Sequence, residues 1–351
     1  MLRLVKRVDV SKRERTLIYS LSILAALLTS GLFVLLMGHS PFEVFHKMIL
    51  GAFGSRLRFQ DTMIIAVPLI ITSIGIMIAF KMKFWNIGGE GQILMGALFA
   101  SYFALNYSSL PRPLLLTIMF AAGFVGGALV GIIPAILKVK LQTNETIITL
   151  MLNYIIFHLV TYLQYGPWRD PDAKGFPRIA NFTENAVLPK LFGLHLGWLI
   201  MLILVIVVTI LLRYSKIGYK IAVVGESKDT ARYAGMNLNR IIISSIAVSG
   251  GICGLVGMIE ASGVNYTLTP SLTGGYGFLA IITTWLSGLN PIAIIPVSIL
   301  FAALTKGGNF IQTAFQIPQS AASVIQSIIL FFVIGAEFFV QYKIVGKEKS
   351  R

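Results

Sequence analysis

The residues best suited to handle a polar solute lie in one glycine-rich stretch, residues 84–92, FWNIGGEGQ. It stands where two apolar segments meet, and its glycines permit an unwound backbone or a close approach of helices. Glu90 falls near a helix start, where a carboxylate can satisfy unpaired amides. The stretch therefore predicts a broken helix that lines a path for a polar solute. A capped, tightly packed turn is the alternative, favoured for Glu90 alone because charge costs less at a membrane edge.

Other side chains in the apolar segments could face the same path. Asn153 lies within one apolar segment, and Gln326 sits similarly within the last. Tyr276 and Phe278 offer aromatic surface to a ring-bearing solute. The alternatives are hydrogen bonding to a neighbouring helix for the amides and ordinary core packing for the rings. The predicted path residues are Trp85, Asn86, Glu90, Gln92, Asn153, Tyr276, Phe278 and Gln326.

The sequence lacks the patterns of an enzyme or a metal protein. It has no G-x-x-x-x-G-K-[ST] phosphate loop, and its four histidines have no metal-ligand spacing. No nucleophile and base stand out as a pair. Glu260 and Glu337 lie near predicted helix ends and are interpreted as interfacial, so the buried carboxylates of an ion-coupled carrier are nearly missing. We expect a non-enzymatic chain without a metal or cofactor of its own, driven by energy from elsewhere.

The segment from Lys216 to Arg240 is a polar, basic island between two long apolar segments. It is long enough to carry its own helix: Ser227 suits the cap, Asp229 the first turn and Gly235 the end. Docking of a partner is the best reason for an ordered helix here. An amphipathic helix lying on lipid is the alternative, but the segment has too few large apolar residues on one face.

Composition places the chain in a membrane. Of its 351 residues, 56% are hydrophobic and 12% are charged, which is more apolar surface than a soluble domain can bury. The formal net charge of +15 would suit nucleic acid, but the charges stand in short clusters between apolar runs, as in positive-inside topology. We therefore predict an all-α, polytopic membrane protein without a nucleic-acid partner.

Ten apolar segments are predicted to cross or enter the bilayer. They lie at about 16–37, 61–80, 88–106, 113–137, 144–165, 195–213, 239–262, 275–288, 291–306 and 319–341. The two that start near 275 and 291 are short and are predicted to be broken or re-entrant. With the N-terminus inside, 20 of the 29 Lys and Arg residues fall on the inner side. This orientation makes residues 1–15, 216–240 and 342–351 cytoplasmic and the proline-rich loop 166–194 extracytoplasmic.

Two glycine motifs point to an internal repeat. Residues 88–91 (GGEG) open the third predicted crossing and residues 274–277 (GGYG) open the eighth. If the chain is two halves of five crossings, the odd number makes the halves oppositely oriented, as in many transporters. Because the motif is short and glycine-rich helix starts recur by chance, similar packing of the two segments in a structure is the test.

Longer blocks of the sequence resemble one known family. Residues 85–98 (WNIGGEGQILMGAL) are similar to a signature of permease subunits in bacterial ABC importers of nucleosides and simple sugars. Residues 225–241 (GESKDTARYAGMNLNRI) resemble the ATPase-docking loop of that family, and residues 274–312 and 325–338 also match it. The first block favours the nucleoside branch, because ribose-type and branched-chain amino acid permeases differ there.

The resemblance implies one permease domain over residues 1–351 in the bacterial cytoplasmic membrane, with both termini cytoplasmic. A separate ATPase subunit would bind ATP, dock on the 216–240 loop and switch the path between outward and inward access. A second permease, identical or homologous, would face the path, and a solute-binding protein or lipoprotein would dock outside. The docking residues for the ATPase would be Gly225, Glu226, Ser227, Asp229, Arg232, Tyr233, Gly235 and Met236.

A nucleoside, with purine nucleosides first, is the expected solute, and a simple sugar such as ribose or galactose is the alternative. An ion-driven secondary carrier is the alternative from another class of transporter, and the scarcity of membrane carboxylates counts against it. A membrane scaffold without transport is disfavoured by the predicted glycine-broken helices.

Overall fold

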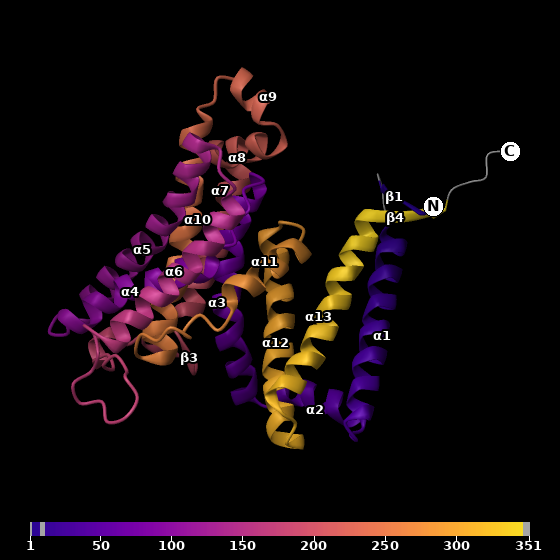
Figure 1. The fold of residues 1–351 in the computed structure, drawn as a ribbon, viewed down its shortest axis with the longest axis horizontal. Helices are drawn as coiled ribbons and strands as arrows, with labels where there is room; N and C mark the ends of the chain where they lie inside the picture. The colour runs from indigo at the N-terminus through magenta and orange to yellow at the C-terminus, as the bar shows by residue number, and fades with distance from the viewer. Residues whose placement is uncertain (1, 8–10, 347–351) are drawn as a thin grey trace. The chain divides into compact units, whose positions relative to one another are not determined.

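The computed structural model describes residues 2–7 and 11–346, and most of them are helical (Figure 1). Within these described residues, eight helices are long and apolar enough to cross a membrane. The chain divides into two compact units: unit 1 comprises residues 1–62 and 300–351, and unit 2 comprises residues 63–299. Two helices, α3 (Arg56–Lys81) and α12 (Pro291–Phe315), contribute residues to both units. The fold is the all-α, polytopic membrane fold that the composition predicts.

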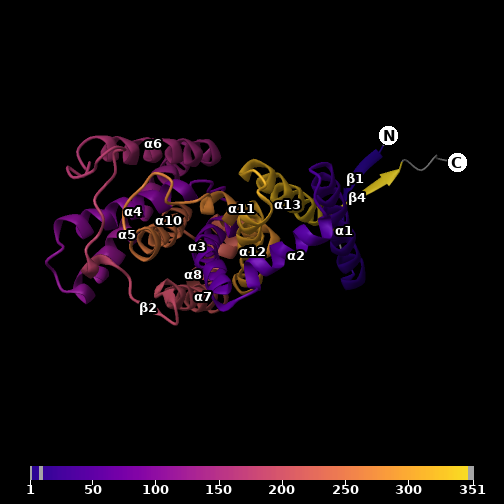
Figure 2. The same cartoon turned by 90° about the horizontal axis from the view of Figure 1, so that it is seen from below.

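Unit 1 brings the first and last described segments of the chain together. β1 (Leu2–Lys6) pairs antiparallel with β4 (Tyr342–Gly346), a pairing that the sequence did not predict. α1 (Lys12–Leu36) packs beside α13 (Gln319–Gln341), and Figure 2 shows the two strands next to each other beside α1. The Tyr19 hydroxyl donates a hydrogen bond to Glu337 Oε2 at 2.5 Å between these helices. Glu337 is therefore held by a partner within unit 1.

A short helix that the sequence did not predict, α2 (Pro41–Phe53), completes unit 1. Its Val44 and Met48 share a small core with Val34 of α1, Ile311 of α12 and Ile325 of α13. With only 13 residues, α2 is too short to count as a crossing.

Unit 2 is built around three tightly crossed helices, α4 (Gly89–Asn106), α5 (Arg112–Leu141) and α10 (Leu238–Glu260). Glycines at the crossing let the backbones meet: a Cβ atom on Gly254 would lie 2.8 Å from the Cα atom of Gly127. Helices in lipid gain little from hydrophobic burial against each other, so this close backbone packing is what stabilises the crossing. α10 continues into η2 (Ala261–Asn265), a π-helical turn.

The two predicted short crossings differ in outcome. α11 (Tyr276–Leu286) has 11 residues, about 16 Å of helix, and is too short to span the hydrocarbon core. α12 is not short, because it runs for 25 residues from Pro291 to Phe315, and the predicted end near 306 is wrong. Lys306 ion-pairs with Asp61 at 2.8 Å, and Gly307 packs against the Met48 backbone, so neither ends the helix.

The loop 166–194 joins α6 (Glu145–Tyr165) to α7 (Gly197–Tyr214) and is ordered by backbone contacts. It contains η1 (Glu184–Ala186), and a small hairpin of β2 (Lys190–Leu191) and β3 (Leu194–His195) leads into α7. The Phe182 amide donates to the Tyr266 carbonyl at 2.8 Å, and the Leu188 amide donates to the Ser262 carbonyl at 2.9 Å. The loop thus covers the end of α10 and η2.

His195 is buried where this hairpin meets α7. Its side chain packs against Gly263, the residue is 2% exposed, and neither ring nitrogen has a hydrogen-bond partner among the described residues. Burial, with a smaller contribution from Lys190, lowers the pKa of His195 to about 4. The imidazole is therefore neutral in the folded protein at neutral pH.

Acidification from pH 6.5 to pH 4 is expected to destabilise the protein through His195. In the unfolded chain the imidazole takes up a proton near pH 6.5, whereas the folded one stays neutral down to about pH 4. This contribution to stability is full above pH 6.5 and falls by on the order of 3 kcal/mol across the window. Thermal unfolding in detergent at several pH values measures it, and His195→Leu should remove this part of the dependence. Equal pH slopes in both proteins would contradict the expectation.

Candidate functional site

Residues 82–88, between α3 and α4, form a non-helical linker. Two amide side chains hold it in place. Asn86 and Gln92 are both fully buried and exchange two hydrogen bonds, each of 3.1 Å. Asn86 Oδ1 also accepts from the Gly88 amide at 3.1 Å. The two side chains fix the linker to the first turn of α4, so the turn is tightly packed, but its N-cap residue, Gly88, has no side-chain cap.

Asn153 of α6 ties the same linker to a second helix. Its Nδ2 atom donates to the Ile87 carbonyl at 3.0 Å, and its Oδ1 atom accepts from the Gly91 amide at 2.8 Å. The Ile87 amide donates to Thr149 Oγ1 at 3.2 Å. The linker is therefore a rigid element between α4 and α6.

Glu90 joins the starts of α4 and α11. Its Oε1 atom accepts a hydrogen bond from the Gly277 amide at 2.7 Å, which is one of the unpaired amides in the first turn of α11. The backbones are close enough that a Cβ atom on Gly89 would lie 3.1 Å from Gly277 Cα. The two G-G-x-G segments thus meet directly, and one carboxylate lies between two positive helix ends.

Next to this junction lies a cavity of about 390 Å³, within the size range of small-molecule sites. α4, α6 and the segment around the start of α11 form its walls. Polar groups are few among mostly apolar and aromatic ones, and the α6 side is exposed. The lining residues are Glu90, Leu94, Asn153, Tyr154, Phe157, His158, Pro270, Thr273 and Phe278. Such a site can hold a small polar solute that carries a flat ring.

The 216–240 segment forms two helices, α8 (Lys216–Glu226) and α9 (Lys228–Tyr233), where one was predicted. Ser227 caps α9 by accepting from the Thr230 amide at 3.2 Å, as predicted. Gly235 follows the end of α9 with a φ of +72°, the left-handed conformation that glycine adopts readily.

α8 is anchored on the end of α3. Gly225 is buried so closely against the Lys81 carbonyl that no side chain would fit, and Lys83 Nζ donates to the Glu226 carbonyl at 3.4 Å. Gly225, which the resemblance places among the ATPase-docking residues, is therefore buried against α3.

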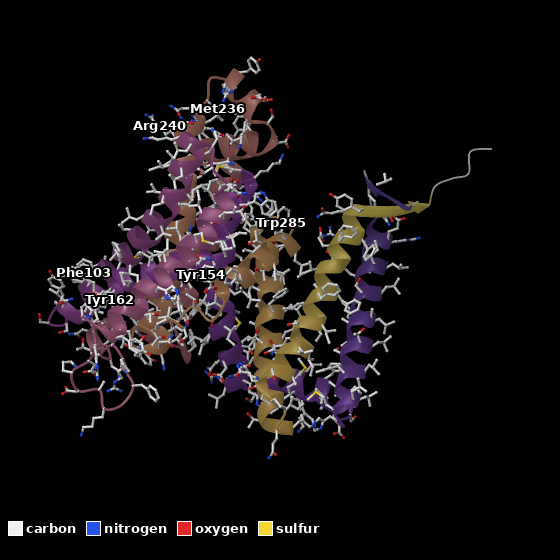
Figure 3. All side chains as sticks on the ribbon, viewed as in Figure 1. Phe103, Tyr154, Tyr162, Met236, Arg240 and Trp285 are labelled. Carbon is white, nitrogen blue, oxygen red and sulfur yellow. The ribbon has the colours of Figure 1, made fainter. Side chains whose placement is uncertain are left out.

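α9 presents an exposed polar and aromatic surface. The Arg232 and Asp229 side chains are 75% and 82% exposed and lie 3.9 Å apart, and Tyr233 is 94% exposed. α8 and α9 together form a helical hairpin. Figure 3 shows Met236 and Arg240 near this hairpin at one end of unit 2, with Phe103 and Tyr162 at the opposite end. The hairpin of α8 and α9 is thus available to a partner at the end of unit 2 away from the loop 166–194 (Figure 1).

Residues 59–334 match the model of a protein family whose description is "Branched-chain amino acid transport system / permease component". The chain belongs to this family. Individual relatives match the permease over nearly its full length. A glucose ABC transporter permease from Haloferax volcanii is 31% identical over 92% of this chain and 88% of its own.

Two further relatives of the permease carry nucleoside names. A nucleoside ABC transporter permease from Lactococcus lactis is 29% identical, with 94% of this chain and 93% of that protein covered. A guanosine ABC transporter permease from Bacillus subtilis is 26% identical, with 97% and 99% covered. The permease is thus a multi-pass membrane subunit of an ABC transporter. It is not itself an enzyme, and its family membership implies a separate ATPase subunit.

The cavity of the permease brings together three of the predicted path residues, Glu90, Asn153 and Phe278. The other five have different surroundings. Asn86 and Gln92 are fully buried and hydrogen-bonded to each other, and Tyr276 is half-buried at the start of α11. Trp85 stacks with Trp285, and Gln326 belongs to unit 1, where it packs against Gly308.

Sequence reasoning missed most of the α6 wall. Tyr154, Phe157 and His158 follow Asn153 at spacings of one, four and five residues, which place them on one side of a helix. That spacing could have identified them once Asn153 was chosen. Thr273 had no comparable signal, because it lies outside regular helix between η2 and α11.

Glu90→Gln is expected to reduce transport by the permease about tenfold with little loss of assembled protein. A glutamine oxygen can still accept from the Gly277 amide, so the junction keeps its hydrogen bond. The charge between two helix ends is lost, and such interactions reach roughly 1–2 kcal/mol in partly buried sites. Uptake by reconstituted transporter, normalised to protein yield, measures this, with Glu43→Gln, at an exposed glutamate in the first turn of α2, as control. Collapse of the yield instead would make Glu90 purely structural.

Proposed function

We propose that the permease imports nucleosides, purine nucleosides first, by alternating access driven by its ATPase partner. The observation that carries the proposal is the cavity, which combines Tyr154, Phe157 and Phe278 with Glu90 and His158. Aromatic rings stack on a nucleobase, and carboxylate, imidazole and hydroxyl groups can bind base edges and ribose hydroxyls. The nucleoside-named and guanosine-named relatives support the same solute class.

A simple sugar is the second candidate, and the glucose-named relative favours it. A sugar ring also packs on aromatic side chains and offers hydroxyls to carboxylates. The two candidates differ in what the rings are needed for. Only a nucleobase has a flat aromatic face that gains from stacking beyond its buried area.

The positions of α8, α9 and the loop 166–194 on unit 2 support the assembly that we propose. The hairpin of α8 and α9 would lie in the cytoplasm and bind the ATPase through Glu226, Asp229, Arg232, Tyr233 and Met236. The loop 166–194 would then face outward, toward a solute-binding protein or lipoprotein, because it lies at the opposite end of the unit. A second permease, identical or homologous, would cover the exposed α6 side of the cavity. Both termini would be cytoplasmic, in a bacterial cytoplasmic membrane.

Competition for uptake tests the solute class. The permease is reconstituted in proteoliposomes with its ATPase and binding protein, and ATP-dependent uptake of labelled guanosine is measured. Excess unlabelled nucleosides are expected to abolish uptake, and excess glucose or ribose is expected to leave it unchanged. Uptake of glucose without guanosine would establish the sugar candidate, and uptake driven by an ion gradient without the ATPase would establish a secondary carrier.

Phe278→Leu is expected to raise the KM for nucleoside about twofold to tenfold, because leucine keeps apolar volume but loses ring stacking, worth roughly 0.5–1.5 kcal/mol. Phe120→Leu is the matched control, since Phe120 is an exposed phenylalanine of α5 outside the cavity lining. Initial uptake rates at several nucleoside concentrations measure the effect. Equal KM values in both variants would remove Phe278 from the site.

A further inference from the structure

α11 is a short helix with one end at the cavity and the other end among aromatic side chains. Phe278, in its first turn, lines the cavity, and Trp285 stands two turns later. Two buried hydrogen bonds join the helix to α3: Thr283 Oγ1 lies 2.5 Å from Ser73 Oγ, and Thr284 Oγ1 donates to the Ser73 carbonyl at 3.0 Å. α11 is therefore attached to α3 as well as to Glu90.

Three aromatic rings connect the far end of α11 to the end of α3. Phe80 of α3 lies 5.5 Å from Trp85 and 5.6 Å from Trp285, measured between ring centroids. Trp85 and Trp285 stack 5.5 Å apart with an interplanar angle of 28°. Trp85 belongs to the linker that leads to Glu90, so the aromatic cluster of Phe80, Trp85 and Trp285 joins α3, the linker and α11 at one point.

The same end of α3 carries α8. Gly225 rests on the Lys81 carbonyl, one residue after Phe80, and Lys83 donates to the Glu226 carbonyl. An unbroken series of contacts therefore runs from the hairpin of α8 and α9 through the aromatic cluster to α11. At the other end of α11, Phe278 reaches the cavity.

We propose that Trp285 is a positioning residue that passes the displacement of the ATPase-docking hairpin to α11 and hence to Phe278. Coupling between distant sites is carried by packed side chains and rigid elements. Here the rigid element is α11. The two hydrogen bonds to Ser73 attach its side to α3, and the cluster ties its last turn to the end of α3 that carries α8. The proposal rests on ATPase docking at α8 and α9, but it does not depend on which solute is carried.

Trp285→Ala tests the proposal in the complete reconstituted transporter. Solute transported per ATP hydrolysed is expected to fall about tenfold, while recovery of the ATPase subunit and basal ATP hydrolysis stay at wild-type levels. Trp285→Phe, which keeps a ring, should recover most of the coupling. Trp198→Ala, in α7 and outside the aromatic cluster, is the matched control and should leave the ratio unchanged.

A second variant distinguishes a loss of coupling in Trp285→Ala from a general loss of structure. Ser73→Cys with Thr283→Cys places two thiols where two hydroxyl oxygens lie 2.5 Å apart, and a thiol oxidant can link α3 to α11 there. In a Trp285→Ala background, the cross-link is expected to restore transport per ATP, and a reductant should abolish the recovery.

Three results would overturn the proposal: wild-type coupling in Trp285→Ala, coupling lost equally in Trp198→Ala, or no recovery after complete cross-linking. Arg232→Glu, made separately in the otherwise wild-type complex, tests docking alone, because its expected effect is loss of the co-purified ATPase subunit. A failure of the docking hypothesis is therefore distinguishable from a failure of the proposed role of Trp285.

Discussion

Arg232→Glu is expected to abolish recovery of the ATPase subunit with the permease while the membrane domain stays folded. Arg232 is 75% exposed on α9, and its contact within the chain is a distant ion pair with Asp229 at 3.9 Å. The Ser227 cap that fixes α9 does not involve Arg232, so the helix should persist. Reversing a charge inside a docking surface places like charges together or leaves a partner unpaired, which costs about 2–5 kcal/mol.

Affinity purification in mild detergent measures this loss, and at least about a tenfold drop in co-purified ATPase is expected from a cost of that size. Lys174→Glu is the matched control, because it makes the same charge reversal at an exposed position of the loop 166–194. An unchanged thermal unfolding midpoint shows that the membrane domain is intact. Full ATPase recovery with Arg232→Glu would mean that the hairpin is not the docking surface.

The hairpin shows which local features a sequence can determine. The cap at Ser227 and the left-handed Gly235 were predictable because both depend on backbone geometry within a few residues. The burial of Gly225 was not, because it depends on Lys81, which is 144 positions earlier in the chain. The role of a glycine in a membrane protein is set by whichever backbone comes close to it, and only the folded chain shows that partner.

The predicted path residues show the same limit for polar side chains. A polar amide in an apolar segment is equally compatible with facing a solute and with satisfying another buried group. Asn86 and Gln92 do the second. Asn153 also does the second, since its amide holds the linker, and it lines the cavity as well. Glu260 was interpreted as interfacial from its place near a helix end. It is 2% exposed, because α10 continues into η2 beneath the loop 166–194.

Helix positions were more predictable than the site because apolar length alone marks them. The segments chosen from the sequence correspond to α1, α3 to α7 and α10 to α13. The error at α12 has a physical cause: Lys306 and Gly307 look like a helix end in isolation, but an ion pair and a close backbone contact keep them within the helix. Long-range contacts thus decide where a membrane helix ends when its sequence is ambiguous.

The largest effect on stability is expected from Gly254→Val in α10. A Cβ atom at Gly254 would collide with the Gly123 carbonyl and lie 2.8 Å from Gly127 Cα, and backbone atoms cannot rotate aside as side chains can. Separating α10 from α5 would open the packing that stabilises unit 2, at a cost of at least about 3 kcal/mol. Little monodisperse protein should be recovered from the membrane, as measured by size-exclusion chromatography.

Gly335→Val separates this steric effect from the intrinsic preference of valine. Gly335 also lies within a long helix, α13, but a Cβ atom there would meet nothing within 4 Å. Both substitutions restrict the side chain in the same way, so any difference between the two proteins comes from helix packing. If both variants give equal yields and unfolding temperatures, the close crossing of α5 and α10 is not what stabilises unit 2. If only Gly254→Val loses yield and stability, the glycines at this crossing are required because they set the distance between α5 and α10.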